Sequence, residues 1–277
     1  MTKTAKFLII PLFATVCCTT VPSHEVQSSP PPAQPVTDEE ETTPSPTPHA
    51  APILLRAPPE GFVDLATFIP GLRLDIRYHT ADNFTGAPVT GYGAPGAWFL
   101  EKPARALGKV QEELQEQGYG LLVYDAYRPR RGTLAMVAWA ERTGQEQLLN
   151  NGYIARRSGH NHGNTIDLTL VDAQTGAVID MGTPWDTLTK RSHTFKVEGE
   201  ALQNRLILKR AMENHGFTYY FREWWHFQMK MEGTRFRDVP YSCFEADEGN
   251  WTAPSGWATP GYTMPSSWPE NVRCPSQ

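Results

Sequence analysis

The sequence has no excess of basic residues and no hydrophobic run long enough to cross a bilayer. Its 25 Lys and Arg residues are outnumbered by 30 Asp and Glu residues, giving a formal net charge of -5. A nucleic-acid-binding surface needs clustered positive charge, so this balance argues against nucleic acid as a partner. The apolar run Phe7–Cys18 is shorter than the ~20 residues of a transmembrane helix. No later segment is long and apolar enough either, so we expect no membrane span.

The start of the chain resembles an export signal. Lys3 and Lys6 precede the apolar run Phe7–Cys18, which is the order found in secretory signal peptides. We therefore interpret residues 1–20 as a signal peptide and expect an exported protein, either periplasmic or secreted. The pair Cys17-Cys18 leaves lipid anchoring as an alternative, although Ala14-Thr15-Val16 is a poor match to a lipid-attachment signal. A short buried helix is the remaining alternative.

Cysteine is scarce, with four residues in the chain. Two of them lie in or beside the predicted signal peptide, which leaves Cys243 and Cys274. Because an exported protein meets an oxidising compartment, we hypothesise a disulfide between these two. Two free thiols are the alternative, and thiol counting under denaturing conditions distinguishes them.

Composition divides the chain into four parts. After the predicted signal, residues 21–59 are rich in Pro, Ser and Thr, and this composition cannot build a core. Pro30–Pro32 and Pro44–Pro48 favour extended chain there, so we interpret the segment as a disordered spacer. We assign residues 60–245 to one folded catalytic domain and residues 246–277 to a C-terminal tail.

Hydrophobic periodicity in the folded part predicts an α+β fold with a central antiparallel sheet flanked by helices. Helical spacing and stop signals predict three helices, over Pro103–Gln117, Thr133–Arg142 and Glu200–Asn214. Apolar runs, alternation and a turn at Gln174–Gly176 predict strands over Gly120–Tyr124, Thr165–Leu170, Val178–Met181 and within Phe217–Met229. Helices and hairpins follow one another without regular strand–helix alternation, which favours α+β.

Two segments carry residues typical of a metal site. His160 lies seven residues before Asp167, which is expected on the polar face of a strand, and Gly163 allows a tight turn between them. Imidazole and carboxylate are ordinary zinc ligands, and catalytic zinc sites take three protein ligands and leave a position for water. A solvated, histidine-rich turn is the alternative for this segment.

The second segment is Glu223-Trp224-Trp225-His226. Its His can supply a third ligand and its Glu a general base. On an ideal strand two residues three apart point to opposite faces, so this interpretation requires a bend, a bulge or a strand end. The alternative is a core His among aromatic residues with a surface Glu. Together the two segments provide the ligands and base of a hydrolytic zinc site.

A third segment, Tyr124–Pro129, follows a predicted buried strand and contains Arg128. An Arg at a strand exit can direct a permanent positive charge at an oxyanion. A surface salt bridge is the alternative and is the more common role of a single Arg.

These motifs resemble those of the VanX-type D-alanyl-D-alanine dipeptidases, within the lysostaphin, D-Ala-D-Ala peptidase and hedgehog group of zinc metallopeptidases. The similarity covers roughly Gly61 to Phe227 in the same order. Besides the three segments above, it rests on Asp75–Tyr78, Ala81–Gly86, Gly91-Tyr92, Ile166–Leu170 and Met181–Asp186. The segment Asn83–Gly86 favours the dipeptidase branch.

The resemblance implies a hedgehog/D,D-peptidase-like fold and one zinc ion per chain held by His160, Asp167 and His226. It implies that Glu223 is the general base and that Arg128 stabilises the transition state. The expected substrate is D-Ala-D-Ala, a small D-amino-acid dipeptide, split into two D-alanines. Asp186 and Ser158 are then expected to contact its ammonium and carboxylate ends.

Two residues, His162 and Thr165, depart from the family pattern, and His162 competes with His160 as a ligand, although the spacing to Asp167 favours His160. Two other functions remain open at this point. One is a D,D-carboxypeptidase acting on peptidoglycan stem peptides, and the other is a non-catalytic zinc module that binds wall fragments. The sequence does not predict the oligomeric state.

Overall fold

The computed structural model describes residues 55–242. The predicted signal peptide, almost all of the predicted spacer, the Cys243–Cys274 pair and the C-terminal tail lie outside the described residues. None of the helices formed by residues 55–242 combines the length and apolar character that crossing a bilayer requires.

The described chain contains strands, α-helices and short 3-10 helices. The strands are β1 (Phe62–Asp64), β2 (Arg73–Leu74), β3 (Trp98–Leu100), β4 (Tyr119–Asp125), β5 (Thr165–Asp172), β6 (Phe217–Tyr220) and β7 (Glu223–Met229). The α-helices are α1 (Leu65–Phe68), α2 (Glu101–Gln115), α3 (Arg130–Arg142), α4 (Glu146–Asn150) and α5 (Gly199–Asn214). The 3-10 helices are η1 (Arg77–His79), η2 (Gly159–His162) and η3 (Lys190–Ser192).

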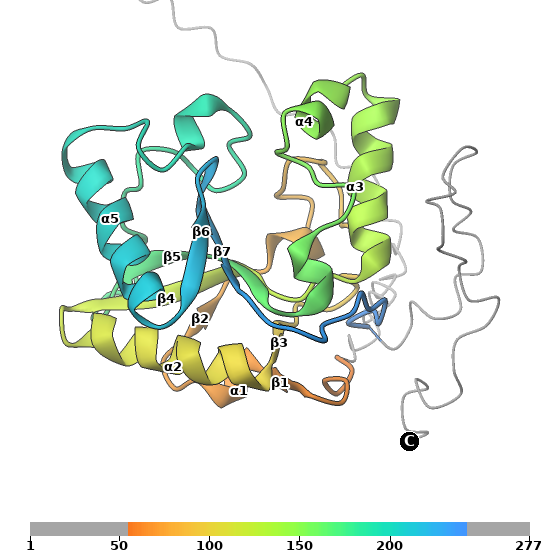
Figure 1. The fold of residues 1–277 in the computed structure, drawn as a ribbon. Helices are drawn as coiled ribbons and strands as arrows, with labels where there is room; N and C mark the ends of the chain where they lie inside the picture. The colour runs from red at the N-terminus through yellow and green to blue at the C-terminus, as the bar shows by residue number, and fades with distance from the viewer. Residues whose placement is uncertain (1–54, 243–277) are drawn as a thin grey trace, which may run out of the picture. The chain divides into compact units, whose positions relative to one another are not determined.

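The central sheet has the strand order β2-β4-β5-β7-β6 (Figure 1). The pairs β4–β5, β5–β7 and β6–β7 are antiparallel, as the sequence predicts. Only the two-residue edge strand β2 runs parallel to its neighbour β4. Strands β1 and β3 form a separate antiparallel pair. The predicted α+β class and central antiparallel sheet are therefore confirmed, with one parallel edge added.

Helices α2 and α5 pack against each other and against the sheet, α2 on β4 and α5 on β6. The residues that predicted α2, Leu107, Val110 and Leu114, are all fully buried. Gly118 follows the helix with a φ of 82°, a left-handed conformation that glycine adopts readily. Figure 1 shows α3 and α4 together on the other side of β7, away from α5. The helices thus flank the sheet as expected.

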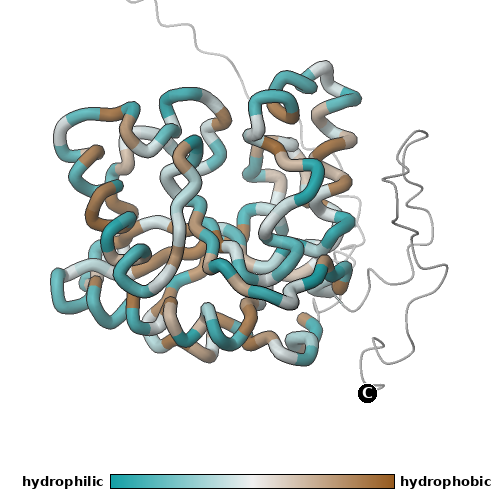
Figure 2. The backbone as a smooth tube through the Cα atoms, viewed as in Figure 1, coloured by the Kyte–Doolittle hydropathy of each residue, from teal (hydrophilic) through white to brown (hydrophobic). Residues whose placement is uncertain are grey.

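Strand β5 is buried on both faces. Ile166, Leu168 and Leu170 are fully buried in the core, as the alternation predicts. The opposite, polar set, which includes Asp167 and Thr169, is equally buried. In Figure 2 apolar positions run through the central strands, while the outer turns are mostly hydrophilic. The polar face of β5 is therefore enclosed, and this enclosure creates the environment of the site.

Two predicted elements differ from those observed. Helix α3 begins at Arg130 rather than Thr133, because its first turn is fixed by Asp238, whose carboxylate accepts the backbone N–H of Arg131 at 2.8 Å. The predicted strand Val178–Met181 forms only an isolated bridge, between Val171 and Val178. After it, the N–H of Gly182 donates to Asp180 Oδ1 at 2.7 Å, so a turn ends the extended segment.

Strand register places polar groups side by side at one end of the sheet. Asp167 on β5 pairs with Asp125 on β4 and with His226 on β7. Directly paired residues on neighbouring strands project to the same face of a sheet. Three ionisable side chains thus form a row on the face of β5 that holds Asp167.

Candidate metal centre

Three ligand atoms converge at this row. Asp167 Oδ1 lies 3.0 Å from Nδ1 of His226 and 3.2 Å from Nε2 of His160. The two histidine nitrogens are 3.3 Å apart. Atoms bound to one tetrahedral ion at about 2.0–2.1 Å would be about 3.3 Å from one another. The predicted ligand set is therefore brought together with a spacing that suits one small ion.

The turn η2 fixes the position of His160. Its N–H donates to Oγ of Ser158, which caps the turn, at 3.2 Å. Its Nδ1 lies 2.7 Å from the carbonyl oxygen of Ala126. A proton on Nδ1 that donates to this carbonyl leaves the Nε2 lone pair free, and such partners commonly set the tautomer of a metal-binding His. Gly163, with a φ of 76°, then turns the chain back into β5.

Asp167 is a buried carboxylate that requires positive charge nearby. Its Oδ1 is fully buried and makes no hydrogen bond despite the two close imidazole nitrogens. Burial opposes ionisation, but the imidazoles of His160 and His226 outweigh it and hold the pKa of Asp167 below its usual range. A buried carboxylate oxygen without a hydrogen bond, close to two imidazole nitrogens, fits a cation-binding site, and two nitrogens with one carboxylate oxygen suit a divalent transition metal.

Glu223 reaches the same side as His226 because strand pairing is irregular there. Tyr219 pairs with Phe227, whereas the next residue, Tyr220, pairs with Glu223, so the register shifts at this point. Glu223 is the first residue of β7, and its Oε2 lies 3.6 Å from Nδ1 of His226. The requirement for a bulge or strand end is thereby met. Burial, together with the charges of Asp167 and Asp186, raises the pKa of Glu223 well above its usual value.

Arg128 lies in the buried interior, held by Asp125. Its Nη2 and Nε donate to Oδ2 of Asp125 at 2.8 and 3.1 Å, so the surface salt bridge considered above is not what forms. The guanidinium carbon lies 5.2 Å from the ring centroid of Tyr78. Burial disfavours the charged form, yet Asp125 reverses this effect and raises the pKa of Arg128 above its usual value. Arg128 is therefore a fixed, permanent positive charge.

Asp125 is a residue whose role the sequence did not predict. It is fully buried, binds Arg128, accepts the hydroxyl of Tyr92 at 2.6 Å, and lies 3.3 Å from Nδ1 of His160. It thus connects the positive charge of Arg128 with the candidate metal ligand His160. The signal was present, because Asp125 lies in the segment Tyr124–Pro129 that contains Arg128, but sequence spacing does not predict its contact with His160.

Asp186 joins the site from the segment between β5 and α5. It has a φ of 56°, the one non-glycine residue with positive φ among residues 55–242. The hydroxyl of Tyr78 donates to its Oδ2 at 2.8 Å. Burial and the charge of Asp167 raise the pKa of Asp186 well above its usual value, against the lowering effect of Tyr78. A strained backbone held by a specific hydrogen bond is a common feature of functional positions.

The structure separates the remaining candidates, Ser158 and His162. Ser158 is buried, lines the same cavity as the ligands, and caps η2 through its Oγ. His162 lies two residues after His160 but packs on Phe236, with ring centroids 4.3 Å apart. It is not part of the ligand cluster, so the preference for His160 over His162 agrees with the geometry.

A cavity of about 270 Å³, termed the metal-side cavity, contains the predicted site residues. This volume is near the lower end of the range for small-molecule sites. Its polar lining groups are Arg128, Ser158, His160, Asp167, Asp186, Glu223 and His226. Its apolar and aromatic lining includes Tyr78, Phe84, Met136, Tyr153, Leu188, Tyr220 and Trp225. All seven predicted site residues therefore meet in one small enclosure.

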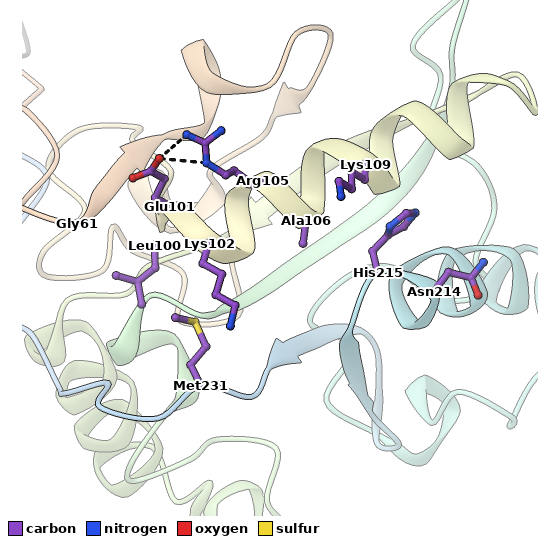
Figure 3. Close-up of a pocket in the computed structure, with 10 residues that line it drawn as sticks. All are labelled: Gly61, Leu100, Glu101, Lys102, Arg105, Ala106, Lys109, Asn214, His215 and Met231. Carbon is purple, nitrogen blue, oxygen red and sulfur yellow. Dashed lines mark hydrogen bonds and ion pairs between the residues drawn. The ribbon is translucent and has the colours of Figure 1, made fainter.

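A larger cavity of about 750 Å³, termed the helix-side cavity, lies between α2 and the end of α5 (Figure 3). Its charged lining is mostly exposed and basic. Glu101 is bound to Arg105, 2.5 Å away, on the same helix, and His215 is bound to Glu113. The one group of His, Cys, Asp and Glu residues in the described chain that could hold a metal lies elsewhere, at the metal-side cavity.

Comparison with known proteins gives a consistent result. The sequence model of a family described as D-ala-D-ala dipeptidase matches residues 59–247. A D-alanyl-D-alanine dipeptidase of Enterococcus faecium is 36% identical over 196 residues, covering 65% of this chain and 94% of that protein. Proteins of the same name match from Enterococcus faecalis (38% identical, 61% and 91% covered) and Escherichia coli (34% identical, 66% and 92% covered).

Among solved structures, the chain is similar to the vancomycin resistance D,D-dipeptidase VanXYg, crystallised in complex with a D-Ala-D-Ala phosphinate analog. The two chains are 17% identical with a TM-score of 0.32, and the match covers 61% of this chain and 66% of the other. A likeness of this size is too low for a comparison of individual residues.

Proposed function

Because the chain belongs to the D-Ala-D-Ala dipeptidase family of metallopeptidases, we propose that it hydrolyses D-Ala-D-Ala to two D-alanines with one bound zinc ion. The ligand atoms are Nε2 of His160, Oδ1 of Asp167 and Nδ1 of His226. One observation carries the proposal: these three atoms lie 3.0–3.3 Å apart in a small cavity that also contains a buried Glu. Two imidazoles and one carboxylate form a common catalytic zinc set.

Bound zinc would supply Lewis acidity and lower the pKa of a water molecule toward neutrality. Glu223 is the residue placed to handle the proton. Its carboxylate takes a proton from the attacking water and later delivers it to the leaving amine. Burial and the charges of Asp167 and Asp186 raise the pKa of Glu223, whereas a cation beside it favours the carboxylate, because an ion's own charge dominates local titration. Its location 3.6 Å from a ligand nitrogen places it close enough for this task.

Arg128 and Asp186 are proposed to bind the substrate at two points. The guanidinium of Arg128 stabilises the negative charge that develops on the peptide oxygen, and its salt bridge with Asp125 keeps it oriented. The Asp186 carboxylate binds the free ammonium group of the substrate. This ammonium group supplies the positive charge that a buried carboxylate needs beside it. Ser158 donates its hydroxyl hydrogen to the substrate carboxylate while its oxygen still caps η2.

The direct test is release of alanine by the purified protein, loaded with zinc and then treated with a chelator. Free D-Ala-D-Ala is compared with a stem peptide that ends in D-Ala-D-Ala. We expect hydrolysis of the dipeptide, lost on chelation and restored by zinc. Absence of dipeptide hydrolysis in the zinc-loaded protein would reject the proposal. The carboxypeptidase and non-catalytic alternatives are not favoured, because the curated relatives are dipeptidases.

We also propose that the protein is exported. The support is the basic and apolar pattern of residues 1–20, which precede the described residues. Fractionation of cells that express the full-length chain tests this: we expect the protein outside the cytoplasm and shortened at its N-terminus. A full-length cytoplasmic product would contradict it.

A further inference from the structure

Three segments distant in the sequence meet at one edge of the metal-side cavity. They are residues 151–155 after α4, residues 193–194 after η3, and residues 220–222, from the last residue of β6 to the residue before β7. Gly152 and Tyr220 line the cavity itself. Their neighbours Asn151 and Phe221 are exposed, so these segments stand between the cavity and solvent.

Hydrogen bonds from the third segment cross to the first. The hydroxyl of Tyr220 donates to the carbonyl of Gly152 at 3.1 Å. The Nη1 of Arg222 donates to the carbonyl of Asn151. The Tyr220 ring also lies 5.8 Å, centroid to centroid, from the imidazole of His226. One side chain thus contacts a proposed metal ligand and closes the edge of the cavity.

The middle segment joins both of the others. The hydroxyl of Tyr153 is 2.9 Å from Nε2 of His193, and the N–H of Thr194 donates to the carbonyl of Phe221 at 3.0 Å. His193 is anchored to α5, because the buried guanidinium of Arg205 donates to its carbonyl at 2.9 Å. The middle segment is therefore fixed to the body of the fold, and the two outer segments are tied to it.

A glycine at position 152 allows the first and third segments to lie close together. Its φ is 75°, and a Cβ added there would lie 2.6 Å from Nη1 of Arg222 and 3.0 Å from the Tyr220 hydroxyl. Most side chains would therefore be strained at this φ and would displace the ends of the Arg222 and Tyr220 side chains from their present positions.

We propose that these contacts form a clasp that restricts the enzyme to free dipeptides. The clasp consists of the side chains of Tyr153, Tyr220 and Arg222 and their partners on residues 151–152 and 193. The inference rests on the proposed function. It adds that the clasp is the structural feature that limits the length of the substrate. A cavity of about 270 Å³ leaves little space beyond a dipeptide. A longer peptide that extends past this edge of the cavity requires the clasped segments to separate.

The test measures kcat/KM for D-Ala-D-Ala and for N-acetyl-L-lysyl-D-alanyl-D-alanine in the zinc-loaded full chain. The variants are Tyr220→Phe, Arg222→Gln and the pair combined. A partly buried hydrogen bond typically contributes about a five-fold factor to an equilibrium. We therefore expect the dipeptide-to-tripeptide ratio to fall roughly five-fold for Tyr220→Phe, less for Arg222→Gln, whose hydrogen bond is exposed, and most for the pair. Tyr119→Phe, at the far end of β4, and Arg105→Gln, on α2, are matched controls that should leave the ratio unchanged.

Hydrogen exchange provides a second readout that does not depend on catalysis. Opening of the clasp should speed amide exchange of residues 151–155 in Tyr220→Phe and not in Tyr119→Phe. An unchanged ratio with both activities falling in parallel, or unchanged exchange, would overturn the clasp. A wild-type enzyme that cleaves both peptides equally well would also overturn it while leaving the proposed function intact. Failure of the wild type to cleave the dipeptide would instead reject the proposed function, and exchange would still test the clasp.

Discussion

The metal-side and helix-side cavities differ in what surrounds their polar groups. In the smaller one, His160, Asp167 and Glu223 are each at most 7% exposed and direct their polar atoms at a common point. In the larger one, Lys102 and Lys109 are exposed, and the acidic group Glu101 is bound to a neighbouring Arg. Desolvation strengthens electrostatic interactions several-fold, so convergent burial and not volume is what makes a cavity chemically active.

The largest expected effect comes from removing a ligand of the metal-side cavity. We predict that His160→Ala loses bound zinc and detectable dipeptide hydrolysis, because only two ligand atoms remain. His162→Ala is the matched control on the same turn, and it should keep both, since His162 packs on Phe236 instead. Metal content and activity are measured on the same samples. Full zinc occupancy in His160→Ala together with loss in His162→Ala would reverse the ligand assignment.

A smaller but still large effect is expected at Glu223. The substitution Glu223→Gln keeps the shape of the side chain and removes its ability to take a proton, so kcat should fall by about 10²–10⁴-fold. Zinc content should stay at one ion per chain, because Glu223 is not one of the three ligands. Normal turnover by this variant would show that another group is the base.

Substitution of Asp125 tests whether its contacts with Arg128 and His160 are needed for the site to function. Asp125→Asn removes the charge that holds Arg128 and weakens the surroundings of His160, so we expect kcat/KM to fall about 10–100-fold and the melting temperature to drop. Asp75→Asn is the matched control, because Asp75 pairs with Arg77 at 2.9 Å in a partly exposed position. Exposed pairs contribute only about 0–1 kcal/mol. Equal effects of the two substitutions would contradict a special role for Asp125.

The smallest effect is expected at the helix-side cavity. Replacing both Lys102 and Lys109 by Ala should change kcat/KM for the dipeptide by less than about two-fold, since isolated surface substitutions have small effects. A loss comparable to that of Asp125→Asn would mean that this cavity takes part in the reaction and that the contrast between the two cavities is wrong.

Much of the site could be predicted from the sequence because its candidate residues lie close together within short segments. His160 and Asp167 are joined by one tight turn, and Glu223 and His226 lie within a single strand, so residue type and spacing make them candidates, and the family resemblance implies their roles. The same holds for α2, whose buried Leu107, Val110 and Leu114 repeat at helical spacing. Local patterns were sufficient to predict an element when, as in α2, all the residues that form the pattern lie within that element.

The rest depends on contacts between distant segments. Asp125 meets His160 across β4 and the turn η2, which precedes β5, and no spacing in the sequence encodes that contact. The clasp likewise joins Gly152 with Tyr220 across 68 residues of chain. Even the enclosure of the polar face of β5 is a tertiary property, because alternation within the strand cannot show what covers that face.

X-ray absorption of the zinc-loaded protein reports the atoms bound to the metal, and it therefore tests whether His160, Asp167 and His226 hold a single zinc ion. We expect one zinc per chain, nitrogen and oxygen ligands at about 2.0–2.1 Å with the signature of two imidazoles, and loss of that spectrum in His160→Ala. Sulfur ligands at about 2.3 Å, or an unchanged spectrum in the variant, would contradict this expectation.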